Sequence, residues 1–199
     1  LSLFLSLPAS IALLIASEEI ISALFGYGQF NESSVLNSAK ALYFFSLGLP
    51  AFAMIKVFSN FFFANHDTKR PFYIALASVL LNILISLYFF KSIGFIIIPI
   101  ATTVSSWFNF IILFLTIKKR KLFSFNDIFI KRFFKIVFSS ILMGLFFNYL
   151  MVFFREELSF EHSLKSIYLI LSVILGLGFY LIISYLIKAF QLKDIKLKY

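Results

Sequence analysis

The sequence predicts an all-α integral membrane protein, and its composition leads to that fold class. Hydrophobic residues make up 61% of the 199-residue chain, and charged residues only 14%. A soluble domain has about half apolar and about a quarter charged residues. The 30 phenylalanines would be hard to bury in a soluble core of this size, whereas lipid-facing helices hold them without strain. The absence of cysteine excludes disulfides and thiolate metal sites.

Six apolar runs are long enough to cross a membrane, because a hydrocarbon core of about 30 Å takes roughly 20 apolar residues. None of the runs alternates apolar and polar residues as a strand would. The prediction is therefore six transmembrane helices joined mostly by short polar turns. They cover about residues 3–25, 35–64, 72–91, 95–117, 133–154 and 166–188.

Positive charge predicts how these helices are oriented. Only Lys91, Arg155 and Lys165 lie in the joints on one side, and Lys40 and Lys56 lie within the second run. Because basic loops stay in the cytoplasm, we expect both chain ends to be cytoplasmic. This also accounts for the net charge of +9 without a nucleic-acid partner. The other thirteen of the 18 basic residues follow the second, fourth or sixth run: Lys69, Arg70, Lys118, Lys119, Arg120, Lys121, Lys131, Arg132, Lys135, Lys188, Lys193, Lys196 and Lys198.

The one long joint, residues 118–132, is a predicted basic cytoplasmic segment at the membrane interface. Phe125, Ile128 and Phe129 fall on one helical face, away from Lys131. One interpretation is a short helix lying among anionic headgroups. The other is that the fifth span begins early. The sequence leaves both open.

The second run contains a proline and a lysine. Its 30 residues would extend about 45 Å as a helix, so it must tilt, bend or protrude. Pro50 removes a backbone donor, so we expect a bend at Gly48–Pro50. Lys56 either extends to the cytoplasmic headgroups or faces a cavity for an anionic substrate. Pro50 and Lys56 are thus candidate gating or cavity residues.

A compact cytoplasmic turn is predicted after this run, at Asp67, Thr68, Lys69 and Pro71. Asp67 can cap the next helix. Pro71 fits its first turn, where a missing N–H costs nothing.

Three segments carry a resemblance to a known family. They read LPASIALLIASEEIISALFGYGQF at 7–30, GLPAFAMIKVFSNFFFANHDTKRP at 48–71 and IPIATTVSSWFN at 98–109. In this order they resemble the MurJ/MviN lipid II flippase family, part of the multidrug/oligosaccharidyl-lipid/polysaccharide exporter superfamily. The resemblance extends over nearly the whole chain and corresponds to the last six of the family's fourteen helices, although the last two match only in hydropathy.

This resemblance implies the tail portion of a longer protein, forming most of the second lobe of a two-lobe alternating-access transporter. The implied activity moves lipid-linked peptidoglycan precursor from the inner to the outer leaflet of the bacterial inner membrane, in which the chain is multi-pass. The implied partners are the lipid-linked anionic substrate, membrane lipids and the N-terminal lobe of the same chain. We expect no flipping by this portion alone, because it has no intramembrane arginine. The alternatives are a related polysaccharide-lipid or multidrug exporter and a non-transporting membrane fragment.

The sequence departs from the family pattern at Glu19, where proline is expected. Glu18 and Glu19 are thereby placed toward the outer half of the first span. They either face the lobe interior or approach the outer membrane interface.

Polar side chains form stripes on the third and fourth spans. Ser78, Asn82 and Ser86 recur every four residues and so share a helical face. Thr102 and Ser105 begin a similar stripe on the next span. Such stripes usually form hydrogen bonds between helices. The sharper hypothesis is a monovalent coupling cation held by oxygens of Asn82 and Thr102, with Ser86 standing where a carboxylate would strengthen binding.

The sequence contains no enzyme motif and no metal cluster. It lacks a zinc-protease His-Glu-x-x-His, a Walker loop, a nucleophile elbow and a dinucleotide fingerprint. His66 and His162 are predicted to lie at opposite membrane faces. We therefore expect a non-enzyme without a cofactor, apart from the candidate cation.

Overall fold

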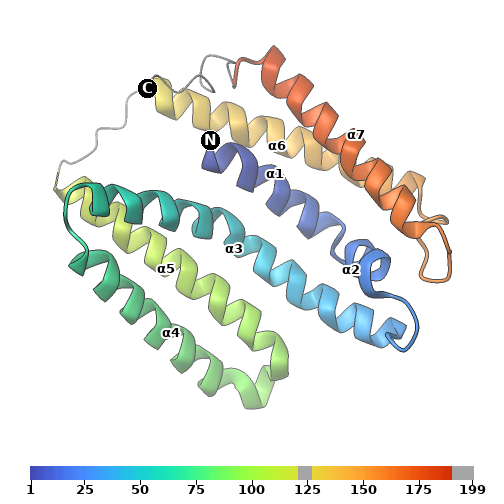
Figure 1. The fold of residues 1–199 in the computed structure, drawn as a ribbon, viewed down its shortest axis with the longest axis horizontal. Helices are drawn as coiled ribbons and strands as arrows, with labels where there is room; N and C mark the ends of the chain where they lie inside the picture. Colours follow the sequence, from blue (N-terminus) through green and yellow to red (C-terminus); the bar gives the residue numbers. More distant parts are fainter. Residues whose placement is uncertain (121–126, 190–199) are drawn as a thin grey trace. The chain divides into compact units, whose positions relative to one another are not determined.

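The computed structural model describes residues 1–120 and 127–189, and all regular structure in these ranges is helical. The described residues form two compact units (Figure 1). The first contains residues 1–6 and 40–120, and the second contains residues 7–39 and 127–189. The helices are α1 (Ser2–Ile15), α2 (Ser17–Phe25), α3 (Glu32–Ala64), α4 (Lys69–Ile93), the 3₁₀ helix η1 (Gly94–Ile96), α5 (Ile97–Lys119), α6 (Asp127–Phe153) and α7 (Lys165–Leu186).

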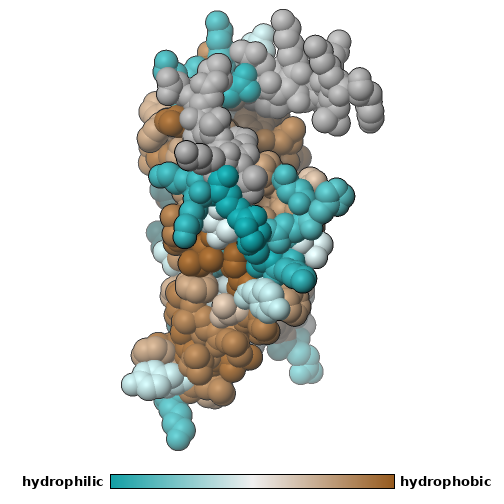
Figure 2. Space-filling model, turned by 90° about the vertical axis from the view of Figure 1, so that its left-hand side faces the viewer, coloured by the Kyte–Doolittle hydropathy of each residue, from teal (hydrophilic) through white to brown (hydrophobic). Residues whose placement is uncertain are grey.

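The helices have the length and surface of membrane spans. By length and composition, the described ranges contain four apolar helical stretches that could cross a membrane, or five if the bent pair α1–α2 is one span. One of the four, Lys69–Lys119, comprises α4 and α5, and each is long enough alone. Large apolar side chains such as Leu87 are exposed, and Figure 2 shows broad brown surface beside teal polar groups. The all-helical membrane fold is confirmed, and the number of six spans stays a prediction.

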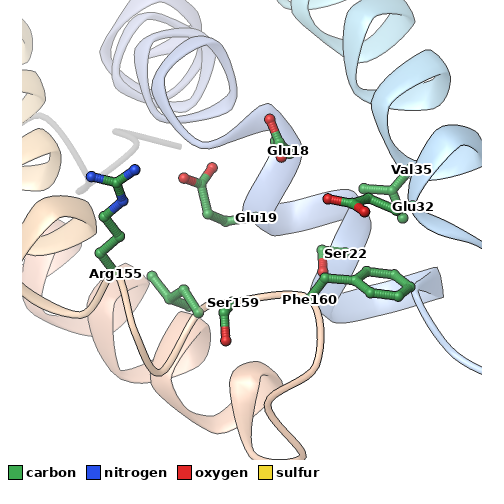
Figure 3. A pocket seen from close by; sticks show the side chains of 9 residues that line it. Glu18, Glu19, Ser22, Glu32, Val35, Arg155, Ser159 and Phe160 are labelled. Carbon is green, nitrogen blue, oxygen red and sulfur yellow. The ribbon is translucent and has the colours of Figure 1, made fainter.

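The first predicted span, 3–25, is not one helix. α1 and α2 meet at an angle of 80°. Ala16, between them, has φ −114° and ψ 32°, which is not helical. Glu18 and Glu19 follow in the first turn of α2, where the helix dipole favours negative charge (Figure 3). Hydropathy does not reveal a single non-helical residue, and a single membrane crossing by the bent pair stays a prediction.

In the first unit, α4 and α5 form an antiparallel hairpin (Figure 1). The chain reverses through η1, and Gly94 has a φ of +73°, which glycine adopts without strain. A buried core of this unit joins α3 to α5 and consists of Phe58, Phe62, Leu113 and Ile117. The Phe58 ring also stacks on Phe110, with ring centres 5.7 Å apart. This packing holds α3 and α5 together near the C-terminal ends of both helices.

The second unit is built on α6 and α7, which pack side by side (Figure 1). Phe147 of α6 is buried, and a Cβ at Gly176 of α7 would lie 3.0 Å from its ring. Likewise, a Cβ at Gly144 would lie 2.6 Å from Ile11 of α1. Small residues thus allow close helix approach, as is typical where van der Waals packing drives association in lipid.

The joint at 118–132 lies partly outside the described residues, because 121–126 are not described. α6 begins at Asp127 and continues without a break to Phe153. Residues 127–132 therefore belong to the same helix as the fifth predicted span, which favours the early-start interpretation. Four of the lysines that support the predicted orientation also lie outside the described residues: Lys121, Lys193, Lys196 and Lys198.

Candidate functional site

The middle of α3 is held by two hydrogen bonds from α5. Thr103 Oγ1 donates to the Phe44 carbonyl oxygen at 2.6 Å, and Trp107 Nε1 donates to the Leu47 carbonyl oxygen at 3.0 Å. Pro50 lies inside α3, which continues through it. A proline disturbs the carbonyls of the turn before it, so the donors from α5 stabilise the backbone next to that disturbance. A Cβ at Gly48 would lie 3.1 Å from Thr103 Oγ1, so this close approach favours glycine.

The two candidate gating residues on α3 have different surroundings. Pro50 is buried, whereas Lys56 is exposed. The exposure of Lys56 agrees with both sequence interpretations, because a side chain that reaches headgroups and one that faces a cavity are both accessible. Its role stays a prediction.

A cavity of about 360 Å³ lies in the first unit, with lining residues from α3, α4 and α5. Asn82 Nδ2 lies 3.1 Å from Thr102 Oγ1 and 3.3 Å from Ser105 Oγ. Thr102 Oγ1 in turn donates to the Ile98 carbonyl oxygen at 2.8 Å. The structure therefore brings the predicted stripes into contact across the hairpin.

The chemistry of this cavity limits what it can hold. Asn109 Oδ1 is buried and has no hydrogen-bond partner among the described residues, so one acceptor is available. The lining includes no carboxylate, and Ser86 is not part of it. No group of three His, Cys, Asp or Glu in the described ranges could hold a metal ion. Neutral oxygens of this kind suit at most a weakly held monovalent cation.

The turn between α3 and α4 is shaped by its backbone. His66 has a φ of +56°, and the Asp67 N–H donates to the Phe62 carbonyl oxygen at 3.0 Å while the His66 N–H donates to Phe63. This pattern is a Schellman motif, which satisfies the last carbonyls of α3. His66 thus has a structural role. Pro71 falls in the first turn of α4, as predicted.

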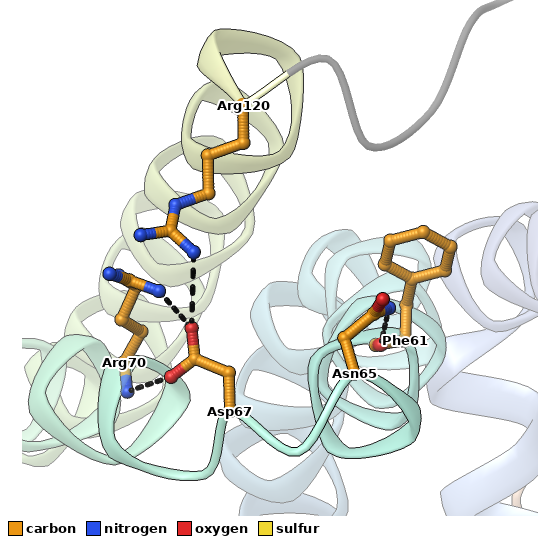
Figure 4. Close-up of polar contacts among 5 residues, drawn as sticks. All are labelled: Phe61, Asn65, Asp67, Arg70 and Arg120. Atoms are coloured by element: carbon orange, nitrogen blue, oxygen red, sulfur yellow. Dashed lines mark hydrogen bonds and ion pairs between the residues drawn. The ribbon is translucent and has the colours of Figure 1, made fainter.

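Asp67 joins this turn to the end of α5 (Figure 4). Its carboxylate accepts hydrogen bonds from the Arg70 guanidinium and, at 3.4 Å, from the Arg70 N–H. Arg120 lies 3.6 Å from the same carboxylate. Thr68, at the N-cap position of α4, makes no capping hydrogen bond with its side chain. The sequence identified Asp67 as a cap, and its pairing with Arg120, 53 positions away, carried no local signal.

Sequence reasoning missed the main polar contact of the second unit, which involves Lys165. Its side chain is only 1% exposed. The ammonium donates to the carbonyl oxygens of Gly26 at 2.8 Å and Phe160 at 2.7 Å. It also lies 4.5 Å from the ring centres of Tyr27 and Phe160. A buried charge is stabilised here by carbonyls and aromatic faces.

The next residue, Ser166, extends this contact. Its Oγ donates to the Ala23 carbonyl oxygen at 2.7 Å and lies 2.7 Å from the Tyr27 hydroxyl. The start of α7 thus fixes the end of α2. The LFGYGQF segment was the available signal, since Gly26 and Tyr27 form these contacts.

Exposed apolar helices, a proline-containing helix bonded to its neighbour and a small polar cavity between helices are features of a multi-pass membrane protein. The sequence profile described as lipid II flippase MurJ matches residues 1–182. The chain belongs to the lipid II flippase MurJ family.

Individual relatives agree with this assignment. A probable lipid II flippase MurJ of Thermotoga maritima is 34% identical over 194 residues, covering 98% of this chain and 37% of that protein. A probable lipid II flippase MurJ of Rickettsia prowazekii is 32% identical, covering 94% of this chain and 37% of that protein. A solved structure of lipid II flippase MurJ in an inward closed conformation aligns with a TM-score of 0.75 at 26% identity, covering 92% and 36%. The chain thus spans little more than a third of these relatives, and the resemblance found in the sequence is confirmed.

Proposed function

We propose that this chain supplies helices of a lipid II flippase, which moves the lipid-linked peptidoglycan precursor between the leaflets of the bacterial inner membrane. The observation that carries the proposal is the family match over residues 1–182. The alignment with an inward closed conformation supports alternating access. The chain spans 37% of the Thermotoga maritima relative. We therefore expect flipping to need further helices that correspond to the rest of that relative, as an N-terminal lobe would provide.

In this mechanism α3 and α5 move together. The bonds from Thr103 and Trp107 attach α5 to α3 just before Pro50. A change of curvature at Pro50 would therefore carry the α4–α5 hairpin with it. A hinge needs a few residues that absorb the change in backbone angles. In α3, Gly48 and Pro50 would supply them.

A second part of the proposal is that the cavity between α4 and α5 takes a weakly held monovalent cation. Thr102, Ser105 and Asn109 would supply the oxygens. The thermal midpoint of the purified chain should then be higher in sodium chloride than in choline chloride at equal ionic strength. The difference should vanish in Asn109→Leu. Equal midpoints of the wild type in the two salts would contradict the cation.

The flippase proposal is tested with a chimera of the Thermotoga maritima relative in which this chain replaces the matching segment. We expect the chimera to support growth of bacteria depleted of their own flippase. A chimera that reaches normal membrane levels without restoring growth would overturn the proposal. The unmodified relative serves as the positive control.

The same chimera tests Lys56. If Lys56 contacts an anionic substrate, Lys56→Gln should lose growth support and Lys56→Arg should retain part of it. Lys40, also exposed on α3, provides the matched control, because Lys40→Gln removes the same charge elsewhere on the helix. Equal growth of the two Lys56 variants would remove this residue from the substrate site.

A further inference from the structure

Four charged side chains converge on one cavity of the second unit without pairing. The cavity measures about 240 Å³. Glu18 and Glu19 reach it from α2, Glu32 from the start of α3 and Arg155 from the loop after α6 (Figure 3). The ion pairs found in the described residues both involve Asp67, so none joins these four groups. Charges that gather around an empty volume without neutralising one another leave room for a charged ligand.

A second, independent observation at the same cavity concerns Ser22. Its side chain is 4% exposed and lines the cavity. Its hydroxyl is buried and has no hydrogen-bond partner among the described residues. Buried hydroxyls are nearly always satisfied, so this one indicates a polar group that completes the site.

The lining selects the chemistry of that group. The carboxylates are not grouped closely enough to hold a metal ion. An alkylammonium group suits them better, because it donates several charge-assisted hydrogen bonds to separate acceptors at longer distances than metal bonds. Val35 and Leu158 offer apolar contact to its carbon stem, and Phe160 offers an aromatic ring. Arg155 adds a donor of the kind that binds phosphate.

We propose that this cavity binds a phosphoethanolamine group, with the ammonium among Glu18, Glu19 and Glu32 and the phosphate at Arg155. The cavity lies where α2 begins and α6 has ended, which the topology prediction places on the outer side of the membrane, toward the lipid headgroups. The expected source is therefore phosphatidylethanolamine, and a water-soluble phosphoethanolamine has the same chemistry. This binding is separate from flipping and needs no second lobe.

The test is native mass spectrometry of the purified full chain with equal amounts of phosphatidylethanolamine and phosphatidylcholine of identical acyl chains. Choline has no N–H donor, so we expect a preference for ethanolamine lipid of roughly tenfold, the value of one hydrogen bond to a charged group. Equal binding of the two lipids by the wild-type chain would overturn the proposal.

Variants assign the preference to the cavity. Glu18→Gln with Glu32→Gln should abolish it, whereas Glu156→Gln with Glu157→Gln should not, because these loop residues carry the same charge outside the lining. Should the first pair fail to fold, the single change Glu32→Gln at an exposed position provides the same test, whereas Arg155→Gln should weaken the binding of both lipids alike. A preference that survives in the folded glutamate variants of the cavity contradicts the proposal. Displacement by glycerophosphoethanolamine at equal concentration supports the site and assigns it to a soluble ligand.

Discussion

Trp107 donates its indole N–H to the carbonyl oxygen of Leu47 at 3.0 Å, three residues before Pro50 in α3. The bond joins positions 60 apart in sequence and satisfies a backbone acceptor in the turn that the proline disturbs. It therefore makes the shape of α3 depend on α5.

Trp107→Phe keeps an aromatic ring and removes this bond. We expect the free energy of unfolding to fall by about 1 kcal/mol, a typical net value for one hydrogen bond. Thermal unfolding in detergent should show a midpoint lower by about 2–4 °C for a chain of this size. Phe108→Leu, at an exposed neighbouring position, is the control and should change little.

Combining this change with Pro50→Ala tests the link to the bend. Alanine restores a backbone donor, so the Leu47 carbonyl region becomes regular and depends less on Trp107. The loss from Trp107→Phe should therefore be smaller in the Pro50→Ala background. Additive effects of the two changes would separate the Trp107 bond from the proline.

Lys165→Met removes the buried ammonium and leaves the Gly26 and Phe160 carbonyls without this donor. We expect a loss of about 2–4 kcal/mol, because buried acceptors lose bonds to a charged donor. Chemical unfolding monitored by circular dichroism gives the measurement. Lys91→Met, at an exposed lysine, should cost no more than about 0.5 kcal/mol. A loss equally small at Lys165 would contradict its structural role.

Asp67→Asn removes the negative charge between Arg70 and Arg120. Both arginines are about two-fifths exposed, so we expect a loss of only about 0.2–1 kcal/mol. The loss should shrink as sodium chloride rises, since salt screens exposed charges. Midpoints of thermal unfolding at low and high salt provide the test. A loss that does not change with salt would assign the role of Asp67 to its backbone hydrogen bond.

The orientation is tested with single cysteines, since the natural chain has none. Cysteines replacing exposed Gln29 or Ser163 should react with membrane-impermeant maleimide in intact cells. Those replacing exposed Thr68 or Lys119 should react only after the membrane is opened. Labelling at Lys119→Cys in intact cells would reverse the predicted topology.

Sequence patterns were most informative about features that depend on a single helix or on two adjacent ones. Apolar length predicted α3 to α7 nearly in place, and the spacing of Asn82 with Thr102 anticipated their contact, because adjacent helices in a hairpin face each other. Contacts across long separations carried no such signal. The burial of Lys165 is an example, since a lysine in a short loop usually faces solvent. The break at Ala16 depends on one residue's dihedral angles, to which hydropathy is insensitive.

The 80° bend after α1 has a consequence for the surrounding lipid. α1 has 14 residues and extends about 21 Å, against about 30 Å for the hydrocarbon layer. If α1 runs along the membrane normal, it ends well inside that layer, and α2 turns sideways with two glutamates at its start. The bilayer beside α1 must then become locally thinner, or headgroups and water must dip toward Glu18. Lipids crossing between leaflets would meet a shorter apolar path at this edge of the protein than elsewhere around it.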